Sequence, residues 1–135
     1  MSNITQVLNT EKNMTTFNKG VRASGLDQRL SSTGPFTVFA PSDMAFGKLD
    51  AGTVDNLLKP ENKADLTTLL NSHVVEGQID FKDLKDGDKL KTIQGKELAV
   101  KVQQGKVTVN NATIQNRDVK TSNGVIHSVD AVLKN

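Results

Sequence analysis

Residues 34–43 read GPFTVFAPSD and combine a strand, the end of that strand and the beginning of a helix. Residues 36–40 are aromatic or β-branched apart from one alanine, which favours a strand. Pro41 is expected to stop the strand, because its ring nitrogen cannot donate a ladder hydrogen bond. Ser42 can cap a helix that begins at Asp43, whose negative charge suits a first helical turn. The segment therefore predicts a strand that leads directly into a helix.

Apolar residues repeat with helical spacing on both sides of this segment. Before it, residues 4–30 place apolar side chains three or four positions apart, and Gly25 is expected to end a helix there. After it, the same spacing runs through residues 45–73, with Pro60 opening the last helix and His73 on its apolar stripe. The N-terminal half of the chain is therefore predicted to be mainly helical.

The second half of the chain has the period of β-strands. Apolar residues alternate with polar ones over residues 98–109, with a hairpin turn expected at residues 104–105. Asn123 and Gly124 indicate another turn just before a final apolar strand. Helices followed by strands, without an internal repeat or linker, predict one α+β domain over residues 1–135, built on an antiparallel sheet.

Composition excludes several classes of site and partner. The 135 residues include no cysteine, which excludes disulfides and thiolate metal sites. The net charge is only +2, and the lysines are scattered without a run. With five Phe and neither Trp nor Tyr to stack on bases, nucleic acid is not an expected partner. No apolar run approaches a membrane span, and residues 1–5 do not resemble a signal peptide.

Two histidines are the main candidates for chemistry. Each could be a ligand or a general base, but each also lies among apolar neighbours, so a buried and hydrogen-bonded ring is the favoured interpretation of His73 and His127. His127, Ser128 and Asp130 do not form a triad, because neighbours on a strand point to opposite faces. A metal-assisted hydrolase, using both histidines and the carboxylates of residues 80–88, remains a minor alternative. That acidic segment is interleaved with lysines and lacks the spacing of a calcium loop.

Three segments together resemble the fasciclin domain family. They are residues 34–46, which begin GPFTVFAPSD, residues 69–77, LLNSHVVEG, and residues 123–130, NGVIHSVD. Their order and spacing match the family over nearly the whole chain. The resemblance implies a wedge-shaped β-sandwich decorated by several helices. It implies no enzymatic activity and no cofactor.

The resemblance also implies a role and a location. Fasciclin domains are extracellular, periplasmic or cell-surface modules that mediate adhesion, so the expected partner is a protein or polysaccharide of the matrix or cell surface, or a second copy of the domain. The absence of cysteine and the compact loops favour a bacterial or archaeal source. Self-association as a structural module is kept as an alternative function.

Some residues are carried over from the family individually. In animal members a Tyr-His segment and an Asp-Ile pair are tied to adhesion, and here these positions hold Ser72-His73 and Asp118-Val119. The serine argues against an integrin partner. We expect His73 to be buried and hydrogen-bonded near Asp43 or the closing strand. The residues assigned to the fold signature are Phe36, Val38, Pro41, Ser42, Asp43, His73, Asn123, Gly124 and His127.

Overall fold

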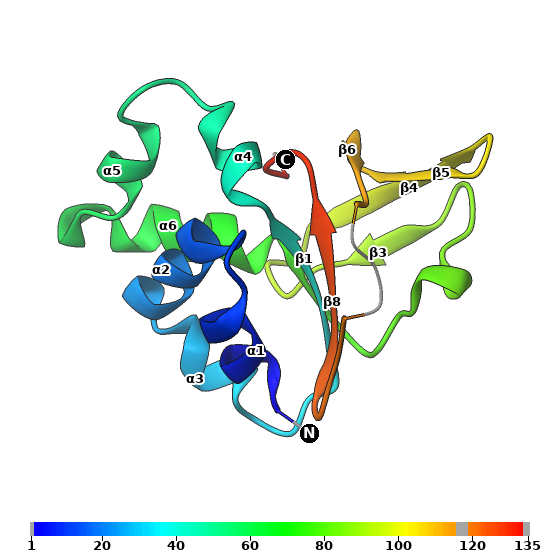
Figure 1. The fold of residues 1–135 in the computed structure, drawn as a ribbon, viewed down its shortest axis with the longest axis horizontal. Coiled ribbons are helices and arrows are strands. Elements are labelled where there is room, and N and C mark those ends of the chain that lie inside the picture. Colours follow the sequence, from blue (N-terminus) through cyan, green and yellow to red (C-terminus); the bar gives the residue numbers. More distant parts are fainter. Residues whose placement is uncertain (1, 116–118, 134–135) are drawn as a thin grey trace.

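The computed structural model describes residues 2–115 and 119–133, which form three layers. Helices cover one face of a mixed sheet, and a second sheet packs on the other face, with its strands running across β1 and β8 (Figure 1). The helices are α1 Ile4–Thr10, α2 Thr15–Ser24, α3 Leu26–Leu30, α4 Asp43–Gly47, α5 Thr53–Leu57 and α6 Lys63–Asn71, with short 3₁₀ turns η1 Pro60–Asn62 and η2 Phe81–Asp83. None of the described helices combines the length and apolar character needed to cross a bilayer.

Residues 34–43 form the predicted strand and the predicted start of a helix. β1 covers Phe36–Pro41, so Pro41 is the last residue of its strand. The hydroxyl oxygen of Ser42 accepts a hydrogen bond from the N–H of Ala45, 3.2 Å away, and caps α4. Gly25, with φ +80°, ends α2 as expected. The strand and helix signals were local, and the structure confirms them.

Helix α6 is shorter than its apolar stripe suggested. Pro60 opens the 3₁₀ turn η1, and α6 itself ends at Asn71. His73 therefore lies beyond the helix, immediately before the short strand β2, Val74–Glu76, which the sequence had not indicated. Val74 and Val75 are buried, and β2 pairs with β1, so tertiary pairing ended the helix here.

The first sheet has the order β2-β1-β8-β7, where β7 is Val119–Thr121 and β8 is Gly124–Val129. β1 and β8 run parallel, with Phe36 opposite Gly124 and Pro41 opposite Val129, so the prediction of an antiparallel sheet was wrong for this central pair. All residues of both strands are buried, which is typical of parallel strands covered on both faces.

The second sheet is antiparallel, as predicted, and has the order β3-β4-β5-β6. Its strands are β3 Lys89–Lys91, β4 Glu97–Gln103, β5 Lys106–Val109 and β6 Ala112–Thr113. Gln104 and Gly105 join β4 to β5 with φ angles of +52° and +78°, the conformation of a type I′ hairpin turn. The hairpin expected at residues 104–105 is thus confirmed.

Two hydrophobic cores share the first sheet. Consecutive residues of β1 point to opposite faces, so Val38 packs with Phe17 and Leu70 on the helical side, and Phe39 packs with Val100 between the sheets. Isolated bridges between Val75 and Thr92, and between Ile114 and Val129, join the two sheets near their edges. The rigid frame is therefore the buried β1–β8 pair, and surface sites form where other elements meet it.

Candidate functional site

His73 is fully buried and tied to the backbone at both ring nitrogens. Its Nδ1 lies 2.8 Å from the carbonyl oxygen of Leu69, and the N–H of Leu133 donates to Nε2 over 2.9 Å. The ring also meets the edge of Phe17, with centroids 6.1 Å apart. A buried, hydrogen-bonded ring was expected, and the partner follows the closing strand as anticipated. Asp43, the other suggested partner, is engaged elsewhere.

These contacts define the protonation state of the ring. Because Nε2 accepts from Leu133, the proton sits on Nδ1 and is donated to Leu69. Burial lowers the pKa of His73 from 6.5 to about 4, although the hydrogen bond to Leu69 acts in the opposite direction. At neutral pH the imidazole is therefore uncharged and has a structural role.

Asp43 joins two helices. Its carboxylate accepts hydrogen bonds from the hydroxyl of Thr15, at 2.7 Å, and from the N–H of Thr16, at 2.8 Å, so it supplies the side-chain cap that α2 lacks at Met14. Burial raises the pKa of Asp43, but these hydrogen bonds outweigh burial and leave the pKa below its usual value. This carboxylate is a helix cap rather than a reactive group.

His127 is also fully buried, on the side of β8 that faces the second sheet. Its ring stacks on Phe39 with centroids 5.6 Å apart, and Nε2 lies 2.8 Å from the carbonyl oxygen of Ile79. His73 packs instead against α2. The hydrolase hypothesis requires both histidines in an open cleft, and this arrangement offers it no accessible ring.

The acidic segment 80–88 uses its carboxylates to hold the loop before β3. Asp86 accepts a hydrogen bond from the N–H of Val102 at 2.9 Å, and Asp80 forms an ion pair with Lys120 at 3.5 Å. Within residues 2–115 and 119–133, no group of three or more His, Asp or Glu side chains is placed to hold a metal ion.

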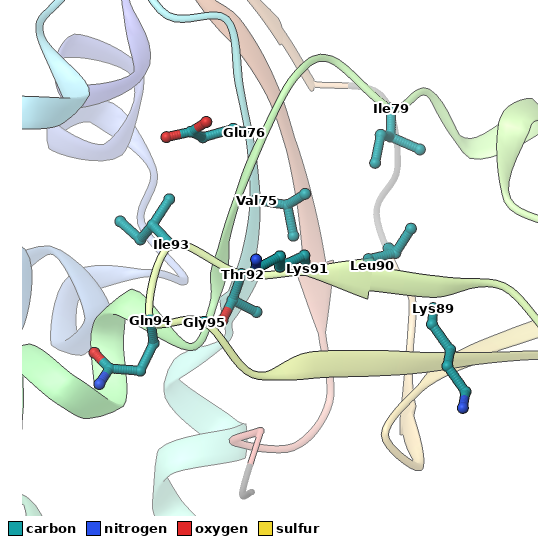
Figure 2. A pocket seen from close by; sticks show the side chains of 10 residues that line it. All are labelled: Val75, Glu76, Ile79, Lys89, Leu90, Lys91, Thr92, Ile93, Gln94 and Gly95. Atoms are coloured by element: carbon teal, nitrogen blue, oxygen red, sulfur yellow. The ribbon is translucent and has the colours of Figure 1, made fainter.

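A groove of about 600 Å³ opens where the edge strands of the two sheets meet. β2 ends one sheet, β3 ends the other, and the bridge from Val75 to Thr92 lies between them. Figure 2 shows Ile79 and Leu90 facing each other across the groove, whereas Lys89 points away from it. Its lining residues are Val75, Glu76, Ile79, Lys89, Leu90, Lys91, Thr92, Ile93, Gln94 and Gly95.

The groove has a mixed lining, in which polar surface exceeds apolar surface. Val75 and Thr92 are buried at its base, and Ile79, Leu90 and Ile93 are only half-buried. Exposed Lys91 lies at the rim together with Glu76, which pairs with Arg29 at 3.1 Å. Half-buried apolar side chains beside charged and amide groups make this groove a candidate binding site.

Sequence reasoning missed this groove because its walls come from segments with no shared motif.

The sequence profile of the fasciclin domain matches residues 12–135. The chain belongs to the fasciclin domain family.

This fasciclin domain is 45% identical to protein sll1483 of Synechocystis sp. over 96% of its length, which covers 72% of that protein. It is 36% identical to transforming growth factor-beta-induced protein ig-h3 of Sus scrofa over 98% of its length, but spans only 19% of that relative. A FAS1 domain pair from the insect cell adhesion molecule Fasciclin I shares its fold, with a TM-score of 0.88 and 20% identity, covering 99% of this chain and 51% of that chain.

The signature residues of this fasciclin domain lie where elements join. Asn123 is the clearest case: its side-chain amide nitrogen donates to the carbonyl oxygens of Leu30 and Ser32, both at 2.7 Å, and its Oδ1 accepts from the N–H of Ile4 at 3.0 Å. Gly124 follows, and a Cβ at this position would overlap the carbonyl oxygen of Phe36. The signature Asn-Gly thus links α1, the end of α3 and the β1–β8 pair.

The three expected adhesion positions have different surroundings. His73 is inaccessible to any partner, and Val119 is half-buried against the helical core at the start of β7. Asp118 lies outside the described residues. The adhesion role of Asp118 and Val119 therefore stays a prediction, and the groove is the candidate site that the structure adds.

Proposed function

We propose that this fasciclin domain is a non-enzymatic binding module that mediates cell adhesion or matrix attachment. The observation that carries the proposal is the groove between β2 and β3, which offers half-buried apolar side chains and a charged rim on a rigid frame. Both histidines, which are the side chains best suited to acid–base chemistry, are buried and hydrogen-bonded to the backbone instead.

The relatives support this role and its location. One fold neighbour is described as part of an insect cell adhesion molecule, and the other relatives include periostin of Homo sapiens, at 27% identity. We infer that the domain works outside the cell, at the cell surface or in the periplasm. Its partner is a protein or polysaccharide presented by the matrix or by another cell.

The test is the retention of cells or matrix fragments by beads that carry the purified chain. We expect beads carrying the chain to retain cells or matrix fragments, and Leu90→Gln to reduce retention at least about fivefold, because losing one buried apolar contact costs on the order of 1 kcal/mol. Leu57→Gln is the matched control, since Leu57 is also half-buried but lies on α5, on the helical side.

Each protein is compared only after its melting temperature shows that it is folded. Equal retention by the two variants would contradict the groove as the binding site. No retention by the unaltered chain would contradict the adhesive role itself. Sedimentation at several concentrations then separates partner binding from self-association, the alternative structural role.

A further inference from the structure

The outer face of the second sheet gathers lysines that are dispersed in the sequence. Residues 89–109 contain five lysines and a single acidic residue, Glu97. Strand alternation buries Leu98, Val100 and Val109 and leaves the side chains between them exposed. The exposed face therefore carries four strand lysines, namely Lys89, Lys91, Lys101 and Lys106.

The strand register aligns three of these lysines in a diagonal row. Lys89 lies opposite Ala99, the same-face neighbour of Lys101 on β4. Lys106 lies opposite Gln103, the next same-face position along β4. Diagonal neighbours on one face are about 7–8 Å apart, so the row crosses β3, β4 and β5 at regular steps.

Negative charge on this face is sparse, and none of the strand lysines has an ion-pair partner among the residues that the structure describes. Glu97 lies opposite Lys91, away from the centre of the row. Asp86 lies near the edge of β4, where its carboxylate already accepts the N–H of Val102. Lysines at strand edges also discourage edge-to-edge aggregation, and this explanation extends to Lys101 and Lys106, because β3 pairs only with residues 97–99 of β4 and β6 only with residues 108–109 of β5.

A shallow depression of about 220 Å³ lies at one end of the row. It is lined only by Lys101, Gln103, Lys106, Thr108 and Asn111. Two ammonium groups, two amides and a hydroxyl suit a ligand with both anionic groups and hydroxyls. No aromatic ring lines the depression, so it has no platform for stacking a base, and lysine acts as a point charge rather than a bidentate fork.

We propose that this face binds an acidic polysaccharide, whose carboxylate or sulfate groups lie along the row from Lys89 to Lys106. The sugar hydroxyls contact Gln103, Thr108 and Asn111 in the depression. The inference rests on the proposed adhesive function and specifies its ligand class. It places the polysaccharide on the outer face of the second sheet, which meets the groove between β2 and β3 at Lys89, a residue that borders both.

Binding is measured with the full chain by calorimetry and amide chemical-shift mapping at 50 mM and 200 mM salt. The probes are a polygalacturonate oligosaccharide for carboxylates and a sulfated dextran oligosaccharide for sulfates, with neutral dextran and oligothymidylate for comparison. We expect one or both acidic sugars to bind and shift residues 99–111, and higher salt to weaken that binding.

The test variant is Lys101→Gln with Lys106→Gln, and the matched control is Lys59→Gln with Lys63→Gln, the same charge change at exposed positions on the helical side. Each lysine close to an anionic surface contributes about fivefold in affinity, so the test variant should bind on the order of 25-fold more weakly, with a flatter salt dependence. The control should bind like the unaltered chain.

Equal weakening by the two variants would show that only net charge matters and would overturn the proposed site. Equal binding of neutral dextran, or tighter binding of oligothymidylate, would overturn the ligand class. The Leu90→Gln variant should bind the acidic sugar as tightly as the unaltered chain, because Leu90 lies in the groove and not in the lysine row. Acidic sugar binding without cell attachment would overturn the adhesive function alone, whereas attachment without acidic sugar binding would overturn this inference alone.

Discussion

At the scale of single residues, His73 shows how a motif position can serve the fold. A family resemblance associates this position with adhesion, but the side chain is fully buried and connects α6 to the segment after β8 through Leu69 and Leu133. A neutral imidazole is suited to this, because one nitrogen donates and the other accepts. The residue could be placed in the core from the sequence, because its neighbours are apolar, but its partner sixty positions away could not.

The lowered pKa of His73 predicts that acid destabilises the domain. The folded state binds this proton only near pH 4, whereas the unfolded chain binds it near pH 6.5, so the unfolded state carries more protons between these values. The contribution of His73 to the free energy of unfolding is therefore fully present above about pH 6.5. It falls as the pH drops toward 4, by about 3 kcal/mol in total. Urea unfolding at a series of pH values measures the change.

His73→Gln is the variant that isolates this effect. It removes the titrating ring and keeps an amide that can both donate and accept. Between pH 6.5 and 4, the free energy of unfolding should decrease much less in the variant than in the unaltered chain. An unchanged pH dependence would show that other groups cause it.

At the scale of elements, caps and turns are the features that sequence reasoning predicted best. Ser42 caps α4, Gly25 ends α2, and Gln104-Gly105 turns the β4–β5 hairpin, as expected. Each depends on the conformation of a few neighbouring residues. The predictions failed where an element depended on distant pairing, as in β2, which pairs with β1.

The β4–β5 turn offers a stabilising substitution. Gln104 has φ +52°, a left-handed conformation that asparagine adopts more readily than glutamine in a type I′ turn. Gln104→Asn should raise the free energy of unfolding by about 0.5 kcal/mol, and Gln104→Val should lower it by about 1 kcal/mol, because a β-branched residue is strained there. Thermal unfolding of both variants checks the order, and the reverse order would contradict the turn type.

At the scale of the whole molecule, the chain is closed by contacts between its two ends. β1 and β8 pair in parallel although most of the sequence separates them, and Asn123 joins the first helix to the turn before β8. The two hydrophobic cores lie on opposite faces of this pair, so both depend on it. The helices and the second sheet spread away from the end of the molecule where the N-terminus lies, which gives the wedge outline seen in Figure 1.

Asn123 should therefore affect the stability of the whole domain. Asn123→Ala removes partners from the carbonyls of Leu30 and Ser32 and from the N–H of Ile4. Since each unsatisfied buried group costs about 1–3 kcal/mol, we expect a loss of about 3 kcal/mol in urea unfolding. Asn56→Ala, at an exposed position on α5, should change stability by less than about 0.5 kcal/mol. Similar effects of the two variants would contradict the joining role of Asn123.

The sequence by itself determined the α+β class, the family, and the local caps and turns, because these depend on short motifs and nearby residues. Only the tertiary structure decided the parallel pairing of β1 with β8, the partner of His73, the groove between β2 and β3, and the lysine row. The physical reason is the range of the interactions. Strand pairing over most of the chain is selected by burial and hydrogen bonding of the complete fold, and the same pairing aligns lysines that are scattered along the sequence.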